Sequence, residues 1–112
     1  MLAGGCLEER PRPGPPLLTF TLARTTVRST TPPDTLQGTV RAEDADGLDS
    51  VWVKVDSTEV GVDGGFDQVF SAPFRFVIAP GKLQGTHVPV QFRARDIGGF
   101  VIVLDTTVVV VP

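Results

Sequence analysis

Apolar and polar residues alternate with a period of two along most of this chain, and short groups of Gly, Pro and Asp interrupt the alternation. In residues 38–56, two alternating segments flank the acidic group Asp44-Ala45-Asp46-Gly47. A period of two places one apolar face on a β-strand. Short carboxylates and a glycine between two such segments favour a tight turn. Residues 38–56 therefore predict a strand, an acidic turn and a second strand.

The same pattern recurs to the end of the chain, without a sustained helical period. Residues 25–34 are rich in Thr and Ser and predict a loop with at most a short edge strand. Ala72-Pro73 predicts a break, and Pro89 predicts an edge strand or a bulge. About seven strands separated by turns predict an all-β fold, an antiparallel sandwich of two sheets. The predicted strands are residues 17–24, 36–43, 50–56, 74–78, 86–95 and 100–111, with a short one between 57 and 71.

Length and charge limit the protein's class. A chain of 112 residues fits one domain, and we expect residues 17–112 to fold and residues 1–16 to form an N-terminal tether rich in proline. The net charge is −3, with both signs interspersed, which argues against a nucleic-acid partner and a polybasic membrane surface. No run reaches the roughly 18 apolar residues of a transmembrane helix.

Cys6 is the only cysteine, so no disulfide forms within the chain. Residues 2–6, Leu-Ala-Gly-Gly-Cys, resemble the lipobox of bacterial lipoproteins, although Leu stands one residue further from the cysteine than usual. The resemblance implies that Cys6 carries lipid, that this anchor is the chain's contact with a membrane, and that the sequence begins within a signal peptide. The alternative is an ordinary cysteine in a tail.

Four segments in order resemble bacterial Ig-like domains, which are similar in architecture to cadherin and fibronectin type III modules. These segments are 38–56, Pro73-Phe74, Gly85-Thr86-His87 and 94–99, the last with Gly99 where the family often has Asn. The resemblance covers roughly residues 17–111. It implies a secreted or cell-surface module with a structural, adhesive or assembly role, and no particular ligand.

Four carboxylates suggest a calcium site, because Ca²⁺ prefers six to eight oxygen ligands. Asp44, Asp46 and Asp49 lie close together in sequence, and Asp96 lies in the last predicted hairpin, at the same end of a sandwich. The alternative is that the first two bind turn amides while Asp49 begins the next strand. The spacing does not match an EF-hand, and no other cofactor is expected.

Catalytic groups are scarce. His87 is the only histidine and opens a predicted strand on its polar side. Nucleophilic catalysis needs a base positioned by a third group, and Cys6 lies in the tail. We expect a protein that is not an enzyme.

Trp52 is expected to face solvent if Val51, Val53 and Val55 face the core. The neighbouring strand would present Arg93 and Arg95 on the same side. Exposed Trp and Arg are enriched at binding hot spots. The alternative is a tryptophan packed under arginine side chains on a plain surface.

Residues Val108, Val109, Val110 and Val111 are apolar on both faces of the last predicted strand. An uncovered apolar edge invites pairing with another chain, so we expect a protein partner or self-association there. The best interpretation is a structural or adhesive Ig-like module of a bacterial surface lipoprotein. One alternative is a filament subunit joined through residues 17–24 or 100–111, and another is a small carbohydrate-binding module that uses Trp52.

Overall fold

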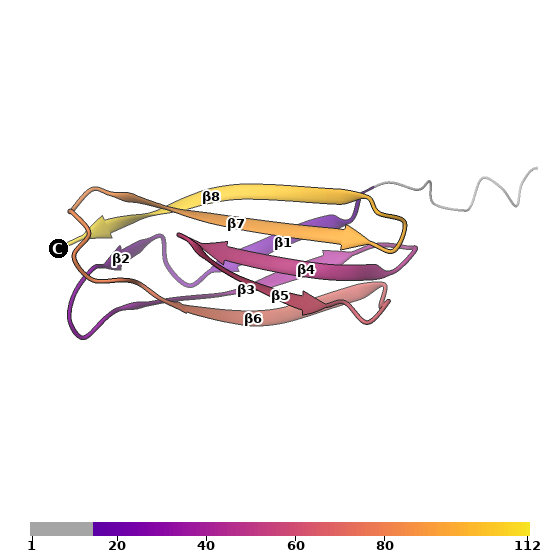
Figure 1. Ribbon diagram of the computed structural model, residues 1–112, viewed down its shortest axis with the longest axis horizontal. Helices are drawn as coiled ribbons and strands as arrows, with labels where there is room; N and C mark the ends of the chain where they lie inside the picture. Colours follow the sequence, from indigo (N-terminus) through magenta and orange to yellow (C-terminus); the bar gives the residue numbers. More distant parts are fainter. Residues whose placement is uncertain (1–14) are drawn as a thin grey trace, which may run out of the picture.

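The computed structural model describes residues 15–112, which form two β-sheets and no helix (Figure 1). One sheet has the order β1-β3-β6 and the other has the order β2-β8-β7-β4-β5. The prediction of an all-β, two-sheet domain is confirmed, with eight strands in place of about seven. The strands are β1 (Leu17–Leu22), β2 (Thr26–Arg28), β3 (Thr35–Glu43), β4 (Leu48–Val55), β5 (Thr58–Asp63), β6 (Val69–Val77), β7 (His87–Asp96) and β8 (Val101–Val111).

The prediction of a purely antiparallel fold is wrong for one strand pair. β2 pairs parallel to β8, with Thr26 opposite Val109 and Arg28 opposite Val111. After β1, the chain crosses to the other sheet and continues in the same direction (Figure 1). The five-stranded sheet is therefore mixed, and it curls into a half-barrel.

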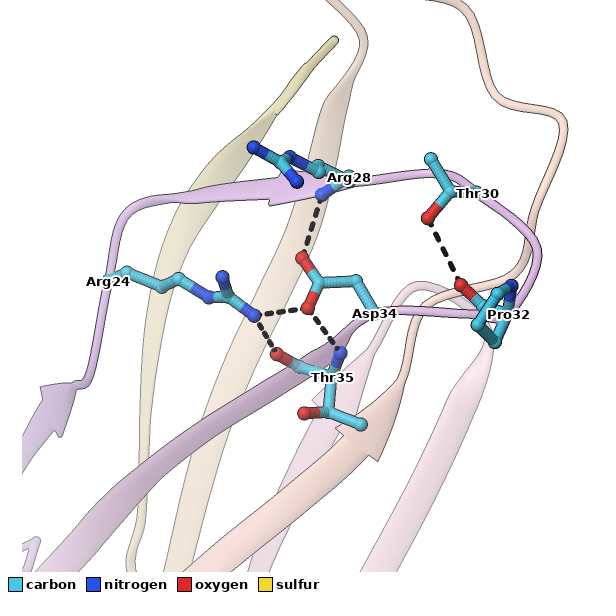
Figure 2. Close-up of polar contacts among 6 residues, drawn as sticks. All are labelled: Arg24, Arg28, Thr30, Pro32, Asp34 and Thr35. Atoms are coloured by element: carbon cyan, nitrogen blue, oxygen red, sulfur yellow. Dashed lines mark hydrogen bonds and ion pairs between the residues drawn. The ribbon is translucent and has the colours of Figure 1, made fainter.

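A polar network fixes the loop between β2 and β3, as Figure 2 shows. The carboxylate of Asp34 accepts hydrogen bonds from the backbone N–H groups of Arg28 and Thr35, both at 2.9 Å. The Arg24 guanidinium pairs with the same carboxylate and donates to the Thr35 carbonyl oxygen at 2.8 Å. These bonds hold the short strand β2 at the edge of the larger sheet.

The predicted inward-facing residues form the core. The alternate valines of β4 are buried, and so are Val88, Val90, Phe92 and Ala94 of β7. Phe92 is fully buried between the sheets, where its ring stacks on Phe20 with a centroid distance of 4.3 Å and meets Phe74 edge-on at 5.6 Å. This aromatic cluster joins the two sheets, and no cysteine lies among the described residues.

Both proline predictions are wrong. β6 runs through Pro73, which pairs with Thr39, because an edge strand has one backbone side without a partner and so accepts a residue without an N–H. Pro89 lies in the central strand β7, one residue beyond the last β4 pair, Val55 with Val90. Its carbonyl accepts from the Asp56 N–H at 2.9 Å. The reciprocal bond to the Asp56 carbonyl, for which proline has no donor, would lie just beyond the last β4 pair.

Candidate functional site

Trp52 lies on the outer face of the five-stranded sheet, as predicted, between Gly61 on β5 and Arg93 on β7. The guanidinium carbon of Arg93 lies 4.3 Å from the centre of the indole ring. Gly61 makes room for the ring, because a Cβ there would lie 2.7 Å from Trp52 Cδ1. The ring is half-buried between these two neighbours.

Surface ion pairs surround this tryptophan. Arg93 Nη2 lies 3.6 Å from Glu59 Oε2, and Arg95 Nε lies 4.0 Å from Asp49 Oδ2. Exposed pairs of this kind contribute little to stability, and a cation over an exposed ring adds about 0.5–1 kcal/mol. Arg93 covers one face of the indole, so that face is not free to stack on a sugar. This geometry matches the packed arrangement that the sequence left open as an alternative.

Asp44 and Asp46 form the turn between β3 and β4, and that turn has the expected chemistry. The Asp46 N–H donates to Asp44 Oδ1 at 2.8 Å, and the Gly47 N–H donates to the Asp44 carbonyl at 3.1 Å. Gly47 has φ of 100°, a conformation that favours glycine. Both carboxylates are thus held at one end of the sandwich.

Asp96 joins these two residues from the end of β7. One carboxylate oxygen each of Asp44, Asp46 and Asp96 lies within 4.8 Å of the others. Asp96 is fully buried; its Oδ1 accepts from the Phe100 N–H at 2.8 Å, and its Oδ2 has no hydrogen-bond partner among the described residues. Burial and the neighbouring Asp96 raise the pKa of Asp44, although the bond from the Asp46 N–H acts in the opposite direction.

Asp49, the fourth predicted ligand, is not part of this group. It lies on β4 and faces Arg95. The predicted proximity of the two hairpin ends is therefore found for three of the four carboxylates.

The apolar end of β8 has a partner within the chain. Val108 and Val110 are buried, and Val109 and Val111 are half-buried. β2 covers the backbone edge of residues 109–111, so this part of β8 is not the free edge that the sequence suggested. Residues 101–108 of β8 have no strand on that side among the described residues.

The opposite edge of this sheet, β5, is free along its whole length within the described residues. All six of its residues are exposed, Val60 and Val62 included, and only β4 pairs with it in the described part of the chain. An apolar hollow of about 220 Å³ lies next to this edge. It is lined from β5 by those two valines and from β6 by Phe70, Phe74 and Phe76, among other residues.

Of the remaining predicted groups, His87 lies within the described residues. His87 is exposed, and its Nδ1 lies 3.4 Å from the hydroxyl of Thr107. Cys6 and its lipidation lie outside the described residues, as does most of the predicted tether. Pro16, directly before β1, is fully buried.

The sequence analysis missed two residues. It did not predict that Gly61 makes room for the Trp52 ring, or that Asp34 lies at the centre of a hydrogen-bond network. For Gly61 the available signal was a glycine within an alternating segment.

Comparison with known proteins gives no match: no family model fits this chain, and no curated protein or solved structure is significantly similar to it. The part of the chain that the structure describes holds no helix with the length and hydropathy of a membrane span.

Proposed function

We propose that residues 17–112 are an Ig-like domain. The order β1-β3-β6 against β8-β7-β4-β5 is similar to the arrangement of an immunoglobulin variable-type sandwich. Two hallmarks of antibody domains differ here: the tryptophan of β4 faces outward, and the Phe92 cluster occupies the space between the sheets where antibody domains have a disulfide. The proposal therefore rests on strand order and not on those marker residues.

We propose that this domain is a structural or adhesive module, without catalytic activity, outside a bacterial cell and tethered by lipid on Cys6. The structural role rests on the path of the chain, and the compartment and anchor rest on the lipobox-like residues 2–6. The chain enters the sandwich at the end where β1 begins, and Pro112 lies at the opposite end (Figure 1). A domain with this path adds its full length to whatever it links, as a spacer requires.

Detergent partitioning tests the anchor. In cells that produce the native gene product, the wild-type protein should separate into the detergent-rich phase of Triton X-114. The Cys6→Ala variant should move to the aqueous phase, because the thiol that carries the lipid is gone. A wild-type protein found in the aqueous phase would contradict the tether.

A filament subunit is the second candidate, and the exposed strand β5 favours it. Unpaired strand edges with apolar side chains are templates for pairing with another chain. Sedimentation velocity at high protein concentration should then show large species, and Val60→Lys should reduce them. Because β5 lies at the opposite edge of its sheet from β2, the variant Thr26→Lys is a suitable control. A strictly monomeric wild-type protein would rule this candidate out.

A further inference from the structure

Asp96 has an unusual environment for a carboxylate. It is fully buried, and its Oδ2 lacks a hydrogen-bond partner within residues 15–112. Burying an ionised carboxylate without compensation is costly. Its neighbours Asp44 and Asp46 add negative charge, and no Lys or Arg of the described residues forms an ion pair with any of the three. The group therefore lacks a positive charge that would balance it.

The spacing of the three carboxylates fits a metal ion. Oxygens bound to one Ca²⁺ at about 2.3–2.6 Å lie at most about 5 Å apart, and the three oxygens here lie within 4.8 Å of one another. Calcium also accepts the irregular geometry of ligands from separate turns, whereas Mg²⁺ demands a nearly ideal octahedron. We propose that Asp44, Asp46 and Asp96 bind a calcium ion, with water completing the coordination.

Such an ion would join two turns that follow strands of different sheets. Asp44 follows β3 of the three-stranded sheet, and Asp96 ends β7 of the five-stranded sheet. One backbone bond, from the Ile97 N–H to the Gly47 carbonyl at 3.1 Å, already links these turns. A bound ion would strengthen this link at the end where Leu17 pairs with Glu43 and the chain enters the domain. The calcium site goes beyond the proposed module function and does not depend on it.

Thermal unfolding with calcium tests the site. At a calcium concentration about a hundredfold above its Kd, we expect Tm to rise by about 10 °C, because the ion binds the folded state only. EDTA should reverse the rise, and Mg²⁺ at the same concentration should produce a much smaller one. An unchanged Tm, or an equal rise with Mg²⁺, would overturn the proposal.

Two variants separate binding from folding. Asp46 is exposed, so Asp46→Asn should fold normally and lose most of the calcium-dependent rise. The matched control is Asp49→Asn, which removes a nearby carboxylate outside the group and should keep the full rise. Isothermal titration with CaCl₂ should give one site in the control and at least a tenfold weaker Kd in Asp46→Asn. Equal responses of the two variants would overturn the assigned ligands.

Discussion

At the scale of single residues, Asp34 shows how one carboxylate organises a loop. It accepts two backbone N–H bonds and pairs with Arg24 (Figure 2). Bonds to the ionised form favour that form. The bond from the Arg28 N–H, together with the Thr35 N–H and Arg24, holds the pKa of Asp34 below its usual value of 3.8, although burial opposes this effect.

The contribution of Asp34 to stability should therefore depend on pH. Because its pKa is lowered in the folded state, the contribution is present above about pH 3.8, the value in the unfolded chain, and is lost as pH falls through the folded value. Asp34→Asn should lower the free energy of unfolding by about 1–2 kcal/mol at neutral pH. Urea unfolding at several pH values checks this. A difference from wild type that stays constant down to about pH 2 would contradict the role of the ionised carboxylate.

The position of the Trp52 ring depends on Gly61, the neighbouring residue on β5, which has no side chain. A Cβ on Gly61 would lie 2.7 Å from Trp52 Cδ1 and 2.8 Å from Nε1, so Gly61→Ala should displace the indole outward from its position between β5 and Arg93. Trp52 is the only tryptophan, and its fluorescence reports this directly. We expect emission at longer wavelength and stronger quenching by acrylamide. Emission identical to that of wild type would show that Gly61 does not seat the ring.

At the scale of elements, the alternation of apolar and polar residues predicted the long strands. It did not predict every pairing between strands that lie far apart in the sequence. The inward residues of β4 and β7 follow directly from period two. The pairing of β8 with β2 does not follow from this period, because β2 has only three residues within a segment rich in Thr and Ser. The proximity of Asp96 to the turn about 50 residues earlier in the chain was predicted. Its burial was not, because a carboxylate at the start of a turn is ordinarily exposed.

Removing β2 should uncover the end of β8. Val27 is buried, whereas Thr26 beside it is exposed. Val27→Asp should detach β2 and leave the backbone of residues 109–111 without a partner, which favours pairing between molecules. We expect lower stability and self-association that rises with concentration, measured by light scattering after size exclusion. Thr26→Asp is the control, and a Val27→Asp protein that stays monomeric at all concentrations would contradict this role of β2.

At the scale of the whole molecule, the two sheets are held together by the core around Phe92. Phe92→Ala should lower the free energy of unfolding by about 3–5 kcal/mol, because a large buried side chain is lost and a cavity remains. Leu83→Ala, at a side chain that is 81% exposed, should change it by less than about 0.5 kcal/mol. Urea unfolding compares the two. Equal effects would contradict the central place of Phe92.

The path of the chain through the sandwich, from the start of β1 to Pro112 at the opposite end, is the basis of the proposed spacer role (Figure 1). The resemblance to Ig-like domains was available from the sequence through the order of its turns and strands. The compartment was suggested by residues 2–6 alone, which lie outside the described part of the chain.

Labelling of intact cells tests this compartment most directly. Lys54 is exposed on β4, so a membrane-impermeant biotin ester should reach it only if the domain lies outside the cell. Mass spectrometry of the Lys54 peptide gives the labelled fraction, and Lys54→Arg is the control for its assignment. We predict the same fraction in intact cells as in lysed cells. Labelling of Lys54 only after lysis would contradict an extracellular module.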